Sequence, residues 1–477
     1  MSLWALLLIL LAFCYTWISI AFFKFEHREI KGKKLESSSV LDFSPVFIRS
    51  GYLLPKGEIR FVAVKHCEDK QFVYLQVATD EGTIEILPLN SILLGPACPW
   101  HYNPKCTYLG FYLTAWLPKK VNWSHPITLK RSFDSPSITI DGPSFLQNKT
   151  DQPEPTHKLA VCIQPAFFYA DWVQFVQFLE IWLQLGATKF YFYVQSLAPE
   201  VRKVAEIYIK DGLLEIVDWS YFPRTRRQNA NEFVYRTEVV ASINDCGLRT
   251  RGESEFVAFV DLDEVITVFK SENLIDFLHQ SLSNRTGALV IRSTDVRVRI
   301  PDKYRLKSDT LQADRLNFDF LNIAQRQKYI YPATYRSKLI ARPEHLYRTH
   351  VHQIMKLSEP KKVKVVYVPN TDCLVYHLRK VDSAIQVLKN QTLTVDHLER
   401  FTRKAAENWT QRARNYHPNG LKLKFRGTSV MSRLEQCLSD LYRTRNETCR
   451  AVIKCQDKLT SETDQQWLLA NHSWITV

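Results

Sequence analysis

The stretch that decides the fold is EFVAFVDLDEV, residues 255–265, in which an apolar run ends in acidic residues. Asp261 and Asp263 stand one residue apart after this run, and Glu264 follows them. Alternate residues of a strand lie on the same side. The pattern therefore predicts a buried strand that presents both aspartates together at its end.

Strand and helix patterns alternate from residue 159 up to this stretch. Strand-like apolar runs are LAVCIQPAFF, TKFYFYVQS and LEIVDW. Helical patterns run from Asp171 to Gly186, from Pro199 to Gly212, and through NEFVYRTEVVASINDCGL, residues 231–248. This alternation is typical of an α/β fold with a mainly parallel sheet covered on both faces. Because ligands of open α/β sheets bind outside the carboxyl ends of the strands, Asp261 and Asp263 mark a candidate site.

Two carboxylates at that edge suit a hard divalent cation, which neutralises charge on a phosphate leaving group. Two other interpretations stay open from the residues alone. One aspartate caps the next helix while the other faces solvent, or the chain is a phosphatase of the haloacid dehalogenase type, which also places D-x-D after an apolar strand. Those phosphatases usually carry the motif after the first strand of the domain, whereas here it lies far into the domain and reads DLDE.

The rest of the chain divides by composition. Residues 47–141 carry short alternating patterns such as FVYLQVAT and GTIEILPL, which predict a small β-rich domain. Residues 142–158, rich in proline and polar side chains, read as a linker, and residues 24–46 read as a stem. The α/β region extends over residues 159–430, and residues 431–477 form a cysteine-containing extension.

Residues 3–23, LWALLLILLAFCYTWISIAFF, carry no charge and have the length of a membrane-spanning helix. We expect a transmembrane anchor there, preceded by a cytoplasmic tail of residues 1–2. A removed signal peptide is the alternative, but the run is long and no small-residue cleavage site follows it. Lysines and arginines follow the span, which taken alone favours a cytoplasmic location for the remainder.

Glycosylation signals and cysteines favour a lumenal body instead. Asn-X-Ser/Thr sequons begin at Asn122, Asn148, Asn284, Asn390, Asn408, Asn446 and Asn471. All of the ten cysteines except Cys14 lie beyond the span, and no CxxC pair indicates zinc, so we expect disulfides. The number left is odd, so at least one thiol is free, and Cys246 is a candidate. The net charge of +14 comes without a long basic run, so we expect no nucleic-acid partner; it indicates a solvated basic surface or a cleft for a phosphate-bearing substrate.

The order of several segments resembles glycosyltransferase family 92 over residues 158–380. These segments are LAVCIQPAFF, FLEIWLQLGATKFYFYVQS, INDCGLR, FVAFVDLDEV, RSKLIARPE and VYHLRK. The resemblance implies a GT-A (Rossmann-like) fold, a UDP-sugar donor that is galactose in the characterised members, manganese, and inversion to a β-linkage, which we take as β-1,4. It also implies a single-pass type II Golgi anchor, which overrides the charge asymmetry at the span.

The resemblance also assigns residues. The metal motif falls on Asp261 and Asp263, with Asp263 as the direct ligand and Asp261 as the contact to the ribose or to a metal-bound water. His377 lies where GT-A enzymes often place a third ligand; a structural histidine is the alternative. Lys338 and Arg342 are expected at the donor diphosphate, unless they belong to a solvated strand face.

Further assignments concern the nucleotide and the acceptor. Asn244 and Asp245 are expected to line the nucleotide pocket. Inverting transfer needs a general base, usually Asp or Glu, and Asp295 and Asp372 are the candidates. The remaining motif is His350 and His352, with the spacing of metal ligands, for which packing or a role at the acceptor site is favoured.

Taken together, the sequence predicts a Golgi β-galactosyltransferase. Galactose would pass from manganese-bound UDP-galactose to a glycan hydroxyl on a glycoprotein or glycolipid. The rival is a membrane-anchored glycan-binding protein that keeps the fold without turnover, and a transferase for another UDP-sugar is a further alternative. The acceptor stays open among galactose, fucose and other sugars.

Overall fold

A computed structural model describes residues 44–132, 136–149, 154–225, 229–283, 285–299, 308–381, 392–395, 398–444, 447–463 and 465–477. Residues Pro45–Val477 form one unit, and the following account concerns that unit. The predicted anchor, residues 3–23, and most of the predicted stem lie outside the described residues. Among the residues that are described, no helix is both long and apolar enough to cross a membrane.

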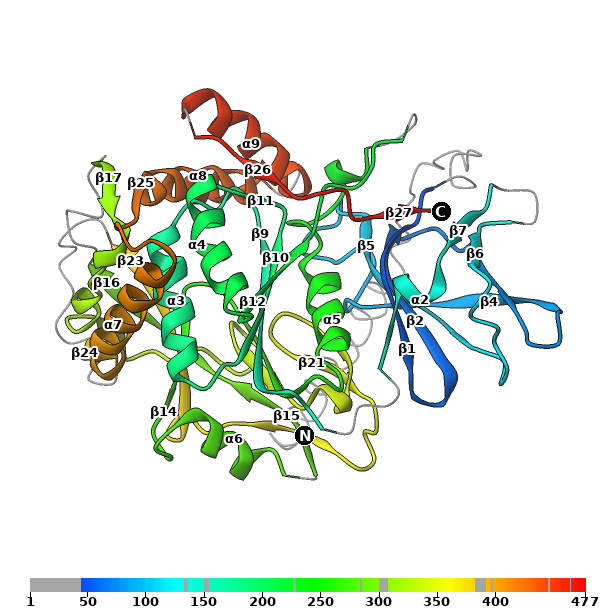
Figure 1. The fold of residues 1–477 in the computed structure, drawn as a ribbon, viewed down its shortest axis with the longest axis horizontal. Coiled ribbons are helices and arrows are strands. Elements are labelled where there is room, and N and C mark those ends of the chain that lie inside the picture. Colours follow the sequence, from blue (N-terminus) through cyan, green and yellow to red (C-terminus); the bar gives the residue numbers. More distant parts are fainter. Residues whose placement is uncertain are drawn as a thin grey trace, which may run out of the picture. The chain divides into compact units, whose positions relative to one another are not determined.

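A nine-stranded, mainly antiparallel sheet confirms β-rich structure in the first part of the chain (Figure 1). Its strands are β1 (Phe47–Leu54), β2 (Glu58–His66), β3 (Val73–Ala78), β4 (Ile84–Leu93), β5 (Tyr108–Trp116), β6 (Ile127–Lys130), β7 (Ile138–Ile140), β8 (Leu146–Asn148) and β27 (Ile475–Thr476). Phe61 of β2 packs within the sheet's own core, whereas its neighbour Val62 packs towards the rest of the molecule. Strands β1, β2 and β5 are therefore buried on both faces, since alternate residues serve two cores.

The central sheet has seven strands in the order β12-β10-β9-β13-β19-β15-β22. These are β9 (His157–Ala166), β10 (Lys189–Val194), β12 (Leu214–Asp218), β13 (Ser254–Val260), β15 (Thr286–Ile291), β19 (Lys338–Ala341) and β22 (Lys364–Tyr367). The first four strands are parallel, as predicted, and β19 is antiparallel to both its neighbours. The strand order reverses between β9 and β13, which makes their carboxyl ends the expected ligand-binding edge.

Helices cover both faces of this sheet (Figure 1). They are α3 (Trp172–Gln184) and α4 (Pro199–Lys210) on one face and α5 (Val239–Arg249) on the other, with α6 (Leu274–Ser281) after β14. Asp171 caps α3 by accepting a hydrogen bond from the backbone N–H of Gln174, as its sequence position predicts. Gly186 follows α3 with φ +99°, and an added Cβ there would collide with Ile275 of α6. Glycine is thus required both for the turn and for the close approach of α6.

The strand predicted to carry both aspartates is in fact divided. β13 ends at Val260, Asp261–Asp263 form a turn, and β14 begins at Glu264 in another sheet. That five-stranded sheet has the order β14-β23-β16-β18-β24. Its members are β14 (Glu264–Val268), β16 (Ser293–Arg299), β18 (Gln325–Gln327), β23 (Cys373–Val381) and β24 (Thr392–Thr394).

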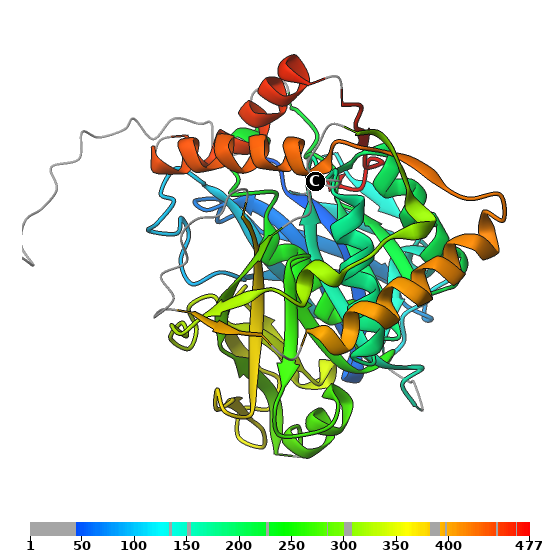
Figure 2. The same ribbon diagram turned by 90° about the vertical axis from the view of Figure 1, so that its left-hand side faces the viewer.

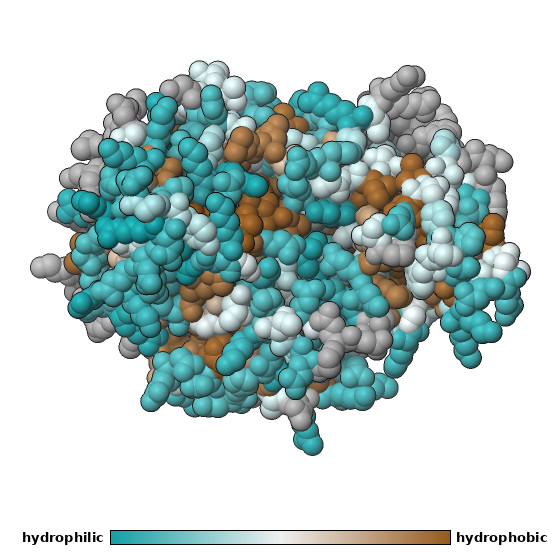
Figure 3. All heavy atoms as spheres, in the orientation of Figure 1, coloured by the Kyte–Doolittle hydropathy of each residue, from teal (hydrophilic) through white to brown (hydrophobic). Residues whose placement is uncertain are grey.

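The C-terminal part of the chain packs back against earlier segments. Its long helices are α7 (Glu399–Tyr416), α8 (Gly427–Arg443) and α9 (Ala451–Glu462), which Figure 2 shows in orange to red. α8 crosses the expected boundary between residues 430 and 431, and β27 pairs with β1. The remaining short elements are α2 (Gly142–Phe145), β11 (Ser196–Leu197), β17 (Ser308–Gln312), β20 (Leu346–Thr349), β21 (Ile354–Leu357), β25 (Lys422–Phe425) and β26 (Leu468–Leu469). The face in Figure 3 is mainly hydrophilic, with hydrophobic residues gathered in a few areas.

Four disulfides staple the fold, in agreement with the expected use of cysteine. They are Cys67–Cys98, Cys106–Cys449, Cys162–Cys246 and Cys437–Cys455. Cys246 is therefore not the free thiol, because Cys162 on β9 faces it from the sheet that α5 covers. The free cysteine among the described residues is Cys373, which is buried in β23.

Candidate active site

The turn of Asp261–Asp263 lies at the carboxyl end of β13, beside the end of β9. β13 and β9 are parallel neighbours, paired from Ser254 with His157 to Val260 with Ile163. The turn therefore stands at the point where the strand order reverses. The two aspartates are not on one side of a strand, and each has its own partner.

Asp261 is held by Lys338 of β19. The Lys338 ammonium lies 2.7 Å from Asp261 Oδ2 and 2.9 Å from Glu264 Oε2, and the Lys338 side chain is only 1% exposed. Glu264 Oε2 also accepts the backbone N–H of Asp261 at 2.9 Å. Burial raises the pKa of Glu264 to about 7, although Lys338 opposes that effect. Lys338 thus clamps the turn rather than reaching into open space for a diphosphate, which corrects the prediction made for it.

Asp263 pairs with His377 of β23. His377 Nε2 lies 2.9 Å from Asp263 Oδ2, and His377 Nδ1 lies 3.5 Å from Asp295 Oδ1. The strand register explains why these side chains meet, because His377 of β23 is paired with Glu264 of β14 on one side and with Asp295 of β16 on the other. Burial alone would raise the pKa of Asp263 and lower that of His377. Their mutual attraction outweighs burial, so the pKa of Asp263 is lowered and that of His377 is raised.

Asp295 is a fixed neighbour of His377. Its Oδ2 accepts a hydrogen bond from the Tyr331 hydroxyl at 2.7 Å, and Arg379 Nε lies 3.6 Å from its Oδ1. His377 Nδ1 and Asp295 Oδ1 are buried and have no hydrogen-bond partner within bonding geometry. Asp295 is therefore placed to orient the imidazole of His377.

A cavity of about 600 Å³ opens beside the turn. Asp261 and Asp263 line it together with Gln164 of β9. Arg379 and Lys380 line it from the end of β23, and Glu435 lines it from α8. Its volume lies in the range of sites for small-molecule ligands. Carboxylates and basic groups thus meet in one cavity.

Glu435 is the carboxylate that α8 presents to this cavity. Burial in the concave wall raises its pKa, while Lys380 and Arg379 act in the opposite direction. Lys380 in turn contacts Asp171, the cap of α3, by a short hydrogen bond. The wall formed by α8 is therefore electrostatically linked to the end of β23.

The segment Arg236, Thr237 and Glu238, which precedes α5, is strained. Their φ angles are 51°, 86° and 59°, a left-handed run that costs about 1–3 kcal/mol per residue outside glycine. The helix expected from residue 231 therefore begins only at Val239. Arg236 donates to the Tyr442 hydroxyl of α8 at 3.1 Å, and the Trp219 indole donates to the Thr237 carbonyl at 2.6 Å. Such strain persists where the surroundings enforce it, as at the wall of a functional cavity.

A second chamber of about 180 Å³ adjoins the first and shares Asp261, Gln164 and Arg236 with it. His350 and His352 line this chamber together with Trp100 from the loop between β4 and β5. Burial lowers the pKa of His352 to about 4 and also lowers that of His350. The two histidines are therefore neutral, and His352 Nδ1 lies 3.0 Å from the Ser337 carbonyl.

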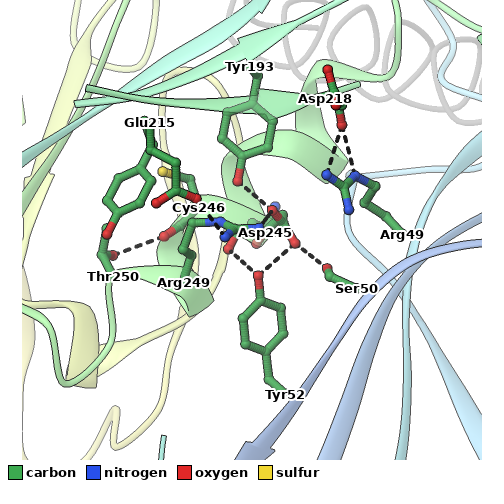
Figure 4. Close-up of polar contacts among 12 residues, drawn as sticks. Arg49, Ser50, Tyr52, Tyr193, Glu215, Asp218, Asp245, Cys246, Arg249 and Thr250 are labelled. Carbon is green, nitrogen blue, oxygen red and sulfur yellow. Dashed lines mark hydrogen bonds and ion pairs between the residues drawn. The ribbon is translucent and has the colours of Figure 1, made fainter. Parts of the chain in front are cut away.

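Asn244 and Asp245 do not line either cavity, contrary to expectation. Asp245 accepts hydrogen bonds from Ser50, Tyr52 and Tyr193 and pairs with Arg249, so it joins α5 to β1 and β10 (Figure 4). Asn244 donates to the Thr349 carbonyl at 2.7 Å and accepts the Thr349 N–H at 2.9 Å. α5 packs both side chains against β1, β10 and β20, so their hydrogen bonds are made outside the two cavities.

Arg342 and Asp372 also lie away from the turn. Arg342 donates to the Leu282 carbonyl at 3.1 Å and lies 3.5 Å from Glu255, near the start of β13. β19 runs antiparallel to β13. Lys338, at the start of β19, therefore lies by the carboxyl end of β13, whereas Arg342, after the end of β19, lies by the start of β13. Asp372 pairs with Lys270 at 3.1 Å, next to the paired residues Val268 and Cys373. Neither residue is placed to serve as a diphosphate ligand or as the base.

Four cavity residues were not singled out from the sequence: Arg236, Arg379, Lys380 and Glu435. Arg379 has a usable signal, since it follows His377 by two positions in one strand. The others have no local signal. Arg236 precedes a helix expected to include it, and Glu435 belongs to a helix whose contact with the cavity depends on the tertiary fold.

No described group of three or more His, Cys, Asp and Glu side chains is already arranged to hold a metal ion. Asp263 and His377 nevertheless fit a shared cation. Cis ligands of an octahedral ion with bonds of about 2.1 Å lie about 3 Å apart, and Asp263 Oδ2 and His377 Nε2 lie 2.9 Å apart. Asp261 is 37% exposed, so its carboxylate is accessible from the cavity despite Lys338.

The family model for glycosyltransferase family 92 matches residues 157–414, more than half of the chain. The chain belongs to glycosyltransferase family 92. The match contains the Asp261–Asp263 turn, His377 and the basic pair after it, and it extends beyond the 158–380 region of the expected resemblance. α8 and the β-rich sheet lie outside it.

Two family 92 proteins of Caenorhabditis elegans are similar over parts of their length. F13G3.3 is 28% identical over 128 residues, which are 26% of this chain and 25% of that protein. F59C6.8 is 25% identical over 236 residues, which are 47% of this chain and 42% of that protein. The chain thus matches less than half the length of either relative.

Solved structures show only remote likeness. The mannosyltransferase PcManGT from Pyrobaculum calidifontis, in complex with GDP-Man and Mn²⁺, is 11% identical with a TM-score of 0.25, and the match covers 66% of this chain and 92% of that one. A cyclomaltodextrinase is 9% identical with a TM-score of 0.14, over 36% of this chain and 40% of that one. Scores this low bear on neither fold nor function.

Proposed function

We propose that the protein is a metal-dependent inverting glycosyltransferase that moves galactose from UDP-galactose to a glycan hydroxyl in β-linkage. One observation carries the proposal: in a family 92 chain, Asp261 and Asp263 line a 600 Å³ cavity at the strand-order reversal, and His377 pairs with Asp263 there. The identity of the sugar and the β-1,4 linkage rest on the family resemblance.

Asp263 and His377 are the proposed metal ligands, and Asp261 is the proposed contact to the ribose or to a metal-bound water. Manganese suits a carboxylate and a neutral imidazole. A bound divalent cation would supply neutralisation of the diphosphate leaving group. Asp295 orients His377 by facing its other nitrogen, as carboxylates commonly do for metal-binding histidines.

Arg379 and Lys380 are the proposed contacts to the donor diphosphate, in place of Lys338 and Arg342. Both line the cavity with Asp263, and the Arg379 side chain is 44% exposed. Positive groups positioned where negative charge develops stabilise the transition state. The overall charge of +14 is in keeping with an anionic donor.

Glu435 is the proposed general base. It lines the same cavity as Asp263 and its pKa is raised, which favours proton uptake from the acceptor hydroxyl. Asp295 is engaged by Tyr331 and His377, so its proposed role is to position the histidine. Glu435→Gln is expected to lower kcat about 100-fold or more with an unchanged KM for the donor. If Asp295→Asn instead lowered kcat about 100-fold while Glu435→Gln kept normal activity, Asp295 would be the base.

The decisive experiment uses the purified full chain in detergent with a panel of UDP-sugars, with and without manganese. Hydrolysis of UDP-galactose and its transfer to galactose- or fucose-terminated glycans are expected only with the metal. Asp263→Asn is expected to abolish both, whereas Asp372→Asn, at the far end of β23, is the matched control and stays active. Turnover of a different UDP-sugar would retain the enzyme and change the donor.

The rival is a glycan-binding protein without turnover. It predicts that no donor is hydrolysed and that manganese does not promote binding of UDP. Glycan binding that survives Asp263→Asn would then favour it. The enzyme is preferred because a pure binder has no use for the acidic turn and basic pair in one cavity.

We further propose a Golgi location with a single-pass type II anchor at residues 3–23 and a lumenal body. The sequon residues Asn122, Asn148, Asn408 and Asn471 are at least partly exposed, which sugar transfer requires. Treatment of the cellular protein with an N-glycosidase is expected to increase its mobility on a gel. Unchanged mobility, together with extraction by carbonate, would contradict this topology.

A further inference from the structure

An exposed group of aromatic side chains stands next to the candidate active site, in the loop between β18 and β19. We call Tyr329, Tyr331, Tyr335 and Arg336 the aromatic shelf. The rings of Tyr329 and Tyr331 are 5.2 Å apart, and those of Tyr331 and Tyr335 are 5.7 Å apart. Tyr329 is 58% and Tyr335 56% exposed. Apolar residues that lie together at a surface, unlike scattered ones, mark sites of ligand or partner binding.

The loop is held in shape although its rings are open to solvent. The Arg336 guanidinium lies 4.7 Å from the Tyr331 ring and 5.7 Å from the Tyr335 ring, and it donates to the Tyr331 hydroxyl at 2.9 Å. Thr334 and Arg336 have φ angles of 68° and 56°, and the Thr334 N–H donates to Ser337 Oγ at 3.1 Å. The strained backbone and the stacked guanidinium preorganise the rings, which lowers the entropic cost of binding a ligand.

The aromatic shelf is continuous with the residues of the proposed reaction. The Tyr331 hydroxyl donates to Asp295 at 2.7 Å, Asp295 faces His377 at 3.5 Å, and His377 pairs with Asp263 at 2.9 Å. None of the shelf tyrosines lines the 600 Å³ cavity assigned to the donor. The shelf therefore stands beside the donor site without being part of it.

We propose that the aromatic shelf binds a pyranose ring of the acceptor glycan. This inference rests on the proposed transferase function. A pyranose has a face of C–H groups that packs on the electron-rich face of an aromatic ring, and its hydroxyls hydrogen-bond at the edge, where Arg336 and the tyrosine hydroxyls lie. Arg336 is already engaged by Tyr331 and lies 3.7 Å from Asp295, so a neutral sugar suits the shelf better than a phosphate.

The test compares three single variants of the full chain: Tyr329→Ala, Tyr335→Ala and Trp116→Ala. Trp116 is the matched control, because it is 62% exposed but belongs to β5 of the nine-stranded sheet. The probe is a core-fucosylated, galactose-terminated biantennary N-glycan, with UDP-galactose and manganese. Each shelf variant is expected to raise the KM for this glycan about tenfold, equivalent to about 1.4 kcal/mol, with unchanged hydrolysis of UDP-galactose in its absence. Tyr329→Phe and Tyr335→Phe keep the rings and are expected to keep the KM within about twofold of the parent.

The outcomes separate this inference from the proposed function. Absence of donor hydrolysis by the parent chain removes the proposed function and the inference with it. Normal donor hydrolysis with an unchanged KM in both shelf variants overturns the inference alone. A raised KM in Trp116→Ala, with unchanged values in the shelf variants, would place the acceptor-binding surface on the nine-stranded sheet and overturn the inference. Parent enzyme that hydrolyses UDP-galactose but transfers no galactose to the N-glycan would also overturn it. Because unassisted hydrolysis requires a folded donor site, it also reports whether each variant folds.

Discussion

At the scale of single residues, Lys338 shows how burial decides the role of a charged side chain. Its sequence context, a basic residue in RSKLIARPE, is that of a phosphate ligand. In the structure its ammonium is enclosed by Asp261 and Glu264, so its charge is already used to hold the acidic turn. A buried ion pair gives little net stability, but removal of one partner leaves a charge without compensation.

Lys338→Met is therefore expected to lower the free energy of unfolding by about 3–5 kcal/mol, as measured by chemical denaturation. The double variant Lys338→Met/Glu264→Gln removes the stranded carboxylate as well and is expected to recover part of that loss. If the double variant lost as much free energy of unfolding as the two single variants together, Lys338 and Glu264 would not stabilise each other.

Glu238 predicts a pH dependence of stability. It is 2% exposed, and burial raises its pKa to about 7 even though the Gly110 N–H donates to it at 3.0 Å. The unfolded carboxyl titrates near pH 4.3, so the folded chain holds the extra proton between these two values. The contribution of Glu238 to stability is thus full below about pH 4, declines by about 4 kcal/mol as the pH rises to about 7, and is constant above that.

Glu238→Gln keeps an acceptor for the Gly110 N–H but does not titrate. Melting temperatures measured from pH 5 to pH 8 are expected to shift in favour of the variant as the pH rises. Parallel curves for the two proteins would show that Glu238 has an ordinary pKa in the folded chain.

At the scale of elements, the sequence predicted those features that depend on residues adjacent in the chain. The cap at Asp171, the glycines that follow α3 and α4, and the apolar strands β9, β10 and β12 were all readable, because each depends on neighbours in the sequence. The start of α5 was not, since three left-handed residues are imposed by Trp219 and Tyr442 from other segments. The division of β13 from β14 was also hidden, because the Glu264 carboxylate that accepts the Asp261 N–H is paired with Lys338, which comes from a distant strand.

Gly186 allows a prediction about how α3 and α6 meet. Gly186→Ala places a side chain at φ +99° and against Ile275, whereas Gly212→Ala meets only the left-handed penalty at φ +73°, with open space around it. We expect about 1–2 kcal/mol of destabilisation for Gly212→Ala and a larger loss for Gly186→Ala, measured by urea denaturation. Equal losses would mean that α6 moves aside without cost.

At the scale of the whole molecule, the family pattern named residues that the structure brings together beside one cavity, but not the other residues that line it. Asp261, Asp263 and His377 were named from motifs, and the structure brings Asp263 and His377 together. Asp245 and Arg342 were misplaced because their partners, Ser50 and Leu282, come from segments that no local pattern connects to them. Glu435 went unnoticed for the same reason, since the packing of α8 over the strand ends depends on the complete fold.

The Cys106–Cys449 disulfide predicts how that packing is secured. It joins the β-rich part to the segment between α8 and α9, with a sequence separation of 343, and the loop-entropy relation assigns about 6 kcal/mol to closure of so long a loop. Cys106→Ser/Cys449→Ser is expected to reduce stability and to weaken binding of UDP with manganese, measured by calorimetry. Cys67→Ser/Cys98→Ser, which opens a local loop with a separation of 31, is the control and is expected to reduce stability alone. Unchanged affinity for UDP in Cys106→Ser/Cys449→Ser would show that the position of α8 does not depend on this disulfide.

The position of α8 in the chain also bears on the order in which the protein is made. During synthesis the acidic turn leaves the ribosome well before Glu435, and domains begin to fold from their N-terminal side. A nascent chain therefore displays Asp261 and Asp263 at an open sheet edge while the helix that completes the cavity is still to come. Ribosomes that stall before residue 427 would leave chains that have the acidic turn but lack the α8 wall of the cavity.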